Sequence, residues 1–148
     1  MNIHNLPVFN FAFGGMSTEL TMLALAAAFG LFQLMFGARM GNNQRGLAWN
    51  VGPRDTPSPP VSPVAGRLER TSRNFMETFP FFAVAVILLA MLNRHNWATV
   101  WGTETYLAAR VIYMPLYGFG VPGLRTIVWL IATLAIILLL VALFVPAL

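Results

Sequence analysis

The sequence predicts an all-α fold, an integral membrane four-helix bundle, and two observations lead to this class. First, 57% of the 148 residues are hydrophobic and only 9% are charged, which is far from the composition of a soluble domain. Second, four long apolar stretches follow one another, separated by segments that contain Gly, Pro and Asn. At this length the chain forms one domain, residues 1–148. Because further spans follow its first apolar stretch, we expect no cleaved signal peptide.

Turn-forming residues set the limits of the four spans. We expect these at about residues 18–40, 64–92, 97–117 and 122–144. Ser17 or Thr18 is the expected cap of the first span. The loop that follows, residues 41–63, contains several prolines and so cannot be helical throughout. Pro80 lies inside the second span and predicts a kink. The two later turns are short, which makes the helices on either side of each turn antiparallel neighbours.

The positive charge indicates how the chain is oriented in its membrane. The net charge of +4 rests on arginine alone, because the chain contains no lysine. The second loop has only Arg94 and the N-terminal tail has no arginine, whereas four lie around the first loop: Arg39, Arg45, Arg54 and Arg67. By the positive-inside rule, the first and third loops should be cytoplasmic and both termini outside. Since most arginines lie beside membrane spans, the basic pI does not indicate nucleic-acid binding.

Several kinds of chemistry are excluded by residue content. The chain has no cysteine, so disulfides, thiolate metal sites and a protein thiol nucleophile are all absent. His4 and His95 lie far apart in the sequence and form no metal-binding pattern, so we expect no metal site.

A charged segment leads directly into the second span. The apolar run from Phe79 to Leu92 has 14 residues, whereas a helix needs about 20 to cross the hydrocarbon core. The span must take its missing turns from the charged segment. This places four polar side chains at or inside the membrane boundary: Arg70, Arg73, Asn74 and Glu77. They are spaced i, i+3, i+4 and i+7 and therefore share a helix face.

Ionisable groups at this depth usually face a polar cavity or the interior of a bundle. We interpret the stripe, which Arg67 extends by one turn, as a binding site. Glu77 would then meet an arginine or a ligand ammonium, because an isolated carboxylate at this depth is costly. The alternative is an internal salt-bridge network that fixes the helix against its neighbours.

The third and fourth spans carry further polar residues. Arg110, Tyr113 and Tyr117 are spaced i, i+3 and i+7 and form a second candidate site wall, although tyrosine is also typical of membrane interfaces. Glu104 lies off that face and is interpreted as a structural partner for an arginine. Arg125 lies in the first turn of the fourth helix, where the helix dipole disfavours a cation unless an anion or thiolate is bound. Simple anchoring by Arg125 is the alternative.

The combined pattern resembles the MAPEG superfamily, the membrane-associated proteins of eicosanoid and glutathione metabolism. The resemblance rests on Arg67-x-x-Arg70-x-x-Arg73-Asn74-x-x-Glu77 followed by Pro80, on Arg110-x-x-Tyr113-x-x-x-Tyr117, and on Arg125. The chain length, the four spans and the proline-rich first loop agree with it. The proline-rich stretch that begins at Gly52 is similar to that of uncharacterised bacterial members.

The resemblance implies a homotrimer that holds glutathione between adjacent subunits near the cytoplasmic side. It implies that Arg70, Arg73, Asn74 and Glu77 bind the tripeptide, that Tyr113 and Tyr117 line the pocket, and that Arg39 is a weaker contact. Arg125, with Tyr117 beside it, would stabilise the glutathione thiolate as the catalytic group. The spacing from Tyr117 to Arg125 differs by one residue from that of eukaryotic members, so Arg125 and Thr126 both remain candidates for the critical position.

Two functions follow from the resemblance as expectations. The first is a glutathione-dependent transferase or peroxidase that acts on lipophilic small-molecule electrophiles in the lipid of a bacterial inner membrane. The second is a non-catalytic scaffold, or an accessory subunit of a larger membrane complex, on the same fold. The Arg-Asn-Glu and tyrosine set favours the enzyme, because a scaffold needs no thiol-activating residue. The fold does not decide the substrate.

Overall fold

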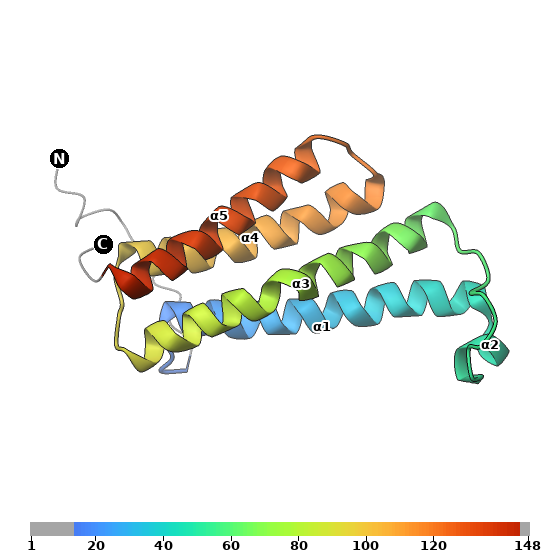
Figure 1. Ribbon diagram of the computed structural model, residues 1–148, viewed down its shortest axis with the longest axis horizontal. Coiled ribbons are helices and arrows are strands. Elements are labelled where there is room, and N and C mark those ends of the chain that lie inside the picture. Colours follow the sequence, from blue (N-terminus) through green and yellow to red (C-terminus); the bar gives the residue numbers. More distant parts are fainter. Residues whose placement is uncertain (1–13, 146–148) are drawn as a thin grey trace.

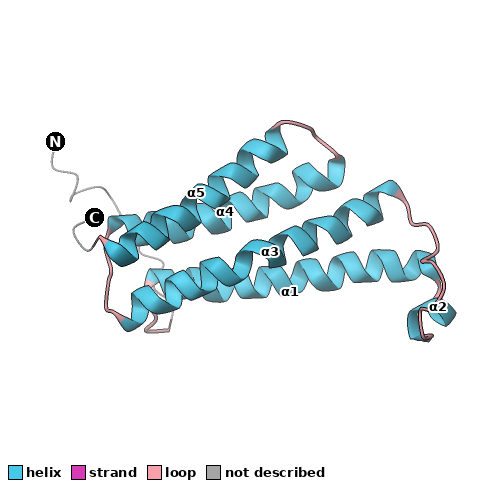
Figure 2. Cartoon of the chain, in the orientation of Figure 1, coloured by secondary structure: helices cyan, strands magenta, loops and turns pink. Residues whose placement is uncertain are grey.

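The computed structural model, shown in Figure 1, describes residues 14–145. His4 and most of the N-terminal tail lie outside that range. The helices are α1 (Thr18–Arg45), α2 (Leu47–Val51), α3 (Pro63–Met91), α4 (Trp97–Phe119) and α5 (Leu124–Phe144). Within the described residues the chain consists of helices and loops only (Figure 2). The predicted all-α fold with four main helices is therefore confirmed.

The four long helices lie side by side, with α1 next to α3 and α4 next to α5 (Figure 1). The end of α1, the start of α3 and the α4–α5 turn all lie at one end of the bundle, at the right of Figure 1. This end is called the loop end below. The described ends of the chain and the α3–α4 turn lie at the other end, called the terminal end. Three helices, α1, α3 and α5, are long and apolar enough to cross a membrane.

The first helix is longer than the sequence pattern indicated. Ser17, one of the two candidate caps, accepts a hydrogen bond from the backbone N–H of Leu20 at 3.4 Å. The helix then runs past residue 40 to Arg45 and ends at Gly46, whose φ of 84° suits glycine. Gly41 is buried against the Glu69 side chain of α3, so tertiary packing extends the helix through a sequence that favours a turn. The helix α3 continues through Pro80 without interruption.

Small residues let α1 approach α3 closely. A Cβ on Gly30 would lie 2.5 Å from the ring of Phe75, and one on Gly37 would lie 3.4 Å from the backbone oxygen of Leu68. The core between α3 and α4 is aromatic, with the rings of Phe82 and Tyr106 stacked at 4.0 Å. These contacts fix how α3 lies between its neighbours and hence where its polar stripe points.

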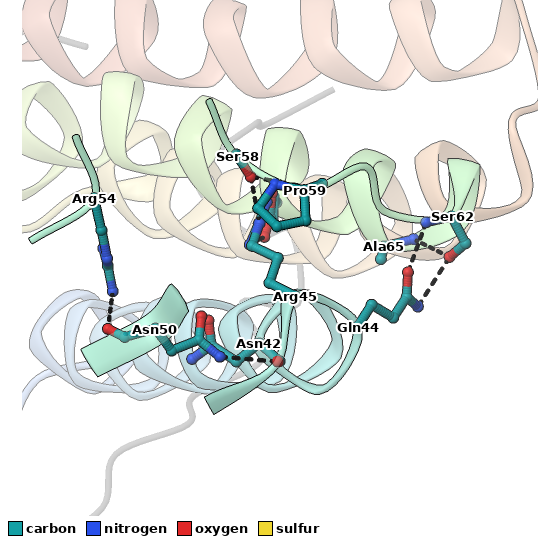
Figure 3. A network of polar contacts seen from close by, with 10 residues as sticks. Asn42, Gln44, Arg45, Asn50, Arg54, Ser58, Pro59, Ser62 and Ala65 are labelled. Atoms are coloured by element: carbon teal, nitrogen blue, oxygen red, sulfur yellow. Dashed lines mark hydrogen bonds and ion pairs between the residues drawn. The ribbon is translucent and has the colours of Figure 1, made fainter. Parts of the chain in front are cut away.

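The first loop is held to the helix ends by polar contacts, which Figure 3 shows. Gln44 bonds both the hydroxyl and the backbone N–H of Ser62, the cap of α3, at 3.1 and 2.6 Å. Arg45 donates to Ser58 at 2.8 Å and forms a two-pronged ion pair with Glu69, at 2.5 and 2.8 Å. The loop therefore closes over the ends of α1 and α3.

A separate polar cluster joins the helices at the terminal end. Glu19, only 2% exposed, accepts a hydrogen bond from the Thr99 hydroxyl at 2.6 Å and lies 3.2 Å from Nδ1 of His95. Asn96 and Thr99 form a reciprocal cap at the start of α4. Arg94 donates to the carbonyl oxygen of Leu143 at the end of α5. The cluster connects α1, α4 and α5 at the end opposite to the candidate site.

Candidate functional site

A pocket of about 240 Å³ opens between α3, α4 and α5 towards the loop end. Its lining comes from residues far apart in the sequence: Asn74, Tyr113, Tyr117, Arg125, Thr126 and Trp129. Four of these are residues that the sequence predicts as site residues, and Thr126 is the predicted alternative to Arg125. The bundle thus brings the polar stripe of the second span, the tyrosines of the third and the first turn of the fourth helix to one place.

The amide of Asn74 is held on both sides. Its Oδ1 accepts a hydrogen bond from Nη1 of Arg110 at 2.9 Å, and its Nδ2 donates to Glu77 Oε2 at 3.4 Å. Because a cationic donor must face the oxygen, the Arg110 bond fixes which way the amide points. Glu77 itself is exposed and has no arginine partner among residues 14–145. Its carboxylate therefore remains open beside Asn74.

Arg110 lies behind the pocket and not in its wall. It is 1% exposed, it donates to the hydroxyl of Thr78 as well as to Asn74, and its guanidinium lies 5.5 Å and 5.7 Å from the ring centres of Tyr106 and Tyr113. Aromatic rings and hydrogen bonds compensate a buried cation without a carboxylate. We conclude that Arg110 positions the pocket residues that it contacts.

Tyr117 is contacted by arginines from two helices. Its hydroxyl accepts a hydrogen bond from Nε of Arg70 at 3.3 Å, and the guanidinium carbon of Arg125 lies 4.8 Å from the centre of its ring. The start of α5 at Gly123 has no side-chain cap, and the N–H groups of Leu124 and Thr126 bond the carbonyl oxygens of Pro122 and Gly123 instead. The two arginines beside Tyr117 make this corner of the pocket positive.

The structure separates two predicted residues from this pocket. Arg73 lies in a different groove of about 500 Å³ between α1 and α3, whose polar lining includes Asn42, Arg54 and Glu69. Arg39 on α1 is exposed and takes part in none of the hydrogen bonds or ion pairs found in the described chain. Arg70 is exposed at the edge of the pocket and reaches it through Tyr117.

The described chain does not contain the internal salt-bridge network that was the alternative interpretation of the stripe. Its ion pairs are Arg45 with Glu69 and His95 with Glu19, and neither includes the residues that share the stripe with Asn74. Glu104 also lacks the expected arginine, and its buried Oε1 has no hydrogen-bond partner in residues 14–145. No cluster of three potential metal ligands occurs in the described part of the chain.

Sequence reasoning missed two contributors, Thr78 and Trp129. Thr78 lies four residues after Asn74, and its hydroxyl receives the second Arg110 bond and lies 3.3 Å from the Tyr106 hydroxyl. Trp129 lies four residues after Arg125 and extends the pocket along α5. The i, i+4 spacing was the available signal in both cases. Every helical residue has a neighbour at i+4, so this spacing identifies a site residue only when it is known which helix face lines the site.

Comparison with known proteins identifies the family of the chain. None of the curated proteins compared with the chain matches it closely enough to count as a relative. The model of the MAPEG family matches residues 22–145, which include every residue of the pocket and nearly all of the four long helices. With its helices, its polar stripe and this match in agreement, the chain belongs to the MAPEG family.

Proposed function

We propose that this protein is a membrane-embedded transferase or peroxidase that uses glutathione against lipophilic electrophiles. The MAPEG family includes glutathione transferases and peroxidases. The observation that carries the proposal is the single pocket shared by Asn74, Tyr113, Tyr117 and Arg125. These side chains supply an amide, two phenols and a permanent cation, which suit a peptide that bears carboxylates and a thiol.

The peptide part of glutathione would lie along the stripe of α3. Arg70 would pair with a carboxylate, Asn74 would bond an amide, and the open carboxylate of Glu77 would accept the ammonium group. The pocket volume of about 240 Å³ is below the roughly 300–1,000 Å³ usual for ligand sites. One chain therefore encloses only part of a tripeptide.

A homotrimer would complete the site. Arg73 and Arg39 lie outside the pocket of their own chain, so they are proposed to reach glutathione bound by an adjacent subunit. A trimer would explain why Arg70 and Arg73, which share the polar stripe of α3, lie at two different grooves of one chain. It also predicts that a separated subunit binds the peptide poorly.

Thiol activation is assigned to Arg125. A free thiol has a pKa near 8.5, so it needs a nearby cation to be largely ionised at neutral pH. Arg125 supplies a charge that cannot be lost by deprotonation, and Tyr117 beneath it offers a hydroxyl to the sulfur. In the transfer reaction the thiolate would attack an electrophilic carbon, form a C–S bond and release the leaving group. Thr126 remains the alternative donor to the thiolate.

The experiment is a titration of glutathione bound to the purified protein, read by the ultraviolet absorbance of the thiolate. We expect saturable binding and a thiol pKa below that of free glutathione. Arg125→Ala should return the pKa to the free value, whereas Arg94→Ala, which removes one charge at the terminal end, should not. If Arg125→Ala keeps the low pKa and Thr126→Val loses it, the role belongs to Thr126. Absence of glutathione binding by the folded protein would refute the proposal.

The proposed location is a bacterial inner membrane, with both termini outside and the first and third loops cytoplasmic. The loop end holds Arg39, Arg45, Arg54 and Arg67, against Arg94 at the terminal end. This asymmetry supports the orientation. In this orientation the pocket would lie near the cytoplasmic surface, where glutathione would be supplied. Accessibility of a single cysteine introduced at Asp55 to a membrane-impermeant reagent tests it.

One observation favours the second candidate, a scaffold or accessory subunit. Gly102 of α4 packs against Leu139 and Ala135 of α5, so the nearby Glu104 lies at about the mid-depth of that apolar helix. A carboxylate at this depth without a partner in the described chain is costly and usually marks an interaction. A stoichiometric membrane partner that is lost on Glu104→Leu would support the scaffold. Solitary assemblies of this chain alone would count against it.

A further inference from the structure

A second pocket of about 420 Å³ lies at the loop end, between α1, α3 and α4. It uses a different face of α4 from the candidate site and shares no lining residue with it. Its floor includes the buried Leu68 and Gly118, and its rim includes the exposed apolar side chains of Phe36, Val64 and Phe119. The volume is within the range of ligand sites. Such a pocket suits a hydrocarbon chain.

Arg67 is the one charged residue in the wall of this pocket. Its Nε donates to the carbonyl oxygen of Gly118 at 2.8 Å, which orients the guanidinium at the α4–α5 turn. Both Nη groups have no hydrogen-bond or ion-pair partner among residues 14–145. A planar guanidinium with free donors is suited to bind the oxygens of a phosphate in a two-pronged manner.

The surroundings of the pocket are also positive. Only Arg45 forms an ion pair in the described chain among the seven arginines of the loop end and the adjacent turns of α3 and α5, which are Arg39, Arg45, Arg54, Arg67, Arg70, Arg73 and Arg125. Basic side chains at this level are attracted to an anionic lipid surface. The pocket thus combines an apolar interior, a free cation in its wall and surroundings in which arginines outnumber the carboxylates of Asp55, Glu69 and Glu77.

We propose that this pocket holds one acyl chain of an anionic phospholipid, with the lipid phosphate bound by Arg67. An anionic headgroup is favoured over a zwitterionic one because no carboxylate lines the pocket to receive a cationic headgroup. The bound lipid would connect α1, α3 and the end of α4. This inference does not depend on thiol chemistry, so it stands or falls separately from the proposed enzyme function.

The test uses the full-length protein in bilayer discs of phosphatidylcholine. Trace phosphatidylglycerol that carries a photoreactive diazirine at the end of one acyl chain is compared with phosphatidylcholine that carries the same chain. We expect the anionic lipid to label the peptides that contain Phe36 and Met114 about tenfold more strongly, and unlabelled phosphatidylglycerol to compete. Equal labelling by both lipids would overturn the role of Arg67. Absence of labelling in these peptides would overturn the site, as expected if another copy of the chain covers it.

Matched substitutions inside and outside the pocket show whether a loss of labelling comes from a lost lipid contact or from a lost fold. Arg67→Gln should reduce labelling by phosphatidylglycerol to the level of phosphatidylcholine, whereas Arg73→Gln, which removes a charge from the same helix outside the pocket, should retain the preference. Val64→Trp should narrow the rim and reduce labelling. Val84→Trp, at an exposed position elsewhere on α3, should not. The proposal is wrong if Arg67→Gln and Arg73→Gln are labelled to the same extent and Val64→Trp and Val84→Trp are as well.

Discussion

Arg110 donates a hydrogen bond of 2.9 Å to Asn74 and joins α4 to α3 directly behind the candidate pocket. The bond links a side chain that contacts no open surface to one that lines the site. The orientation of the Asn74 amide on α3, which we propose binds glutathione, therefore depends on Arg110 of α4. Such a connection is testable as a coupling between two positions.

We expect Arg110→Met and Asn74→Ala to be strongly non-additive. Asn74→Ala takes a partner from the buried Arg110, and Arg110→Met takes the cationic donor from the half-buried Asn74. The two changes should therefore share a coupling of about 1–3 kcal/mol in a double-mutant cycle. The measurement is thermal unfolding in detergent for the four proteins of the cycle, together with glutathione affinity. Additive effects on both quantities would show that the two residues act independently.

Gly30 and Gly37 should respond oppositely to alanine. A Cβ at Gly30 would lie 2.5 Å from the ring of Phe75, which is 2% exposed and packs against the rings of Phe29 and Phe79. Gly30→Ala should therefore destabilise the protein by about 1–3 kcal/mol. At Gly37 the nearest atom is 3.4 Å away, so Gly37→Ala should be neutral or stabilising by up to roughly 1 kcal/mol through helix propensity.

Thermal unfolding of the two glycine variants checks this contrast. The double variant Gly30→Ala with Phe75→Leu should recover part of the loss, because leucine lacks the ring atoms that the new methyl group meets. Equal effects of the two single substitutions would mean that α1 and α3 are not packed as closely as described.

The ion pair between Arg45 and Glu69 should control the first loop more than global stability. Partly exposed pairs contribute only about 0.2–1 kcal/mol, but Arg45 also bonds Ser58 in the middle of the loop (Figure 3). Glu69→Gln should therefore speed backbone hydrogen exchange across residues 46–61 with little change in unfolding temperature. Asp55→Asn, which removes a loop charge without breaking this contact, is the control and should leave exchange unchanged.

Glu104→Leu should stabilise the isolated protein in detergent. Glu104 is half-buried and its Oε1 atom has no hydrogen-bond partner in residues 14–145, so an apolar side chain removes the cost of desolvating this carboxylate. The check is the unfolding temperature of Glu104→Leu beside that of Thr105→Leu, a neighbouring position on α4. A clear loss of stability on Glu104→Leu alone would reveal a partner for the carboxylate within the assembly.

The spacing of residues in the sequence predicted much of the site. The i, i+4 relation of Arg70 to Asn74, and of Tyr113 to Tyr117, placed each pair on one helix face, and the structure brings three of these four residues into the lining of one pocket with Arg125. Spacing alone did not distinguish Arg73 from Asn74. These neighbours point to different grooves because α1 packs on one side of α3 and α4 on the other.

The sequence by itself determined the class of the protein, its four long helices and the polar residues that interrupt them. Composition, helical period and capping residues act locally, so they can be recognised without knowing what packs where. Only the tertiary structure decided that α1 continues through Gly41, that Arg110 lies behind the pocket, and that Arg67 lies in the wall of a separate apolar cavity. Each of these depends on contacts between helices distant in sequence, and such contacts determine the direction in which a side chain points and the partner it meets.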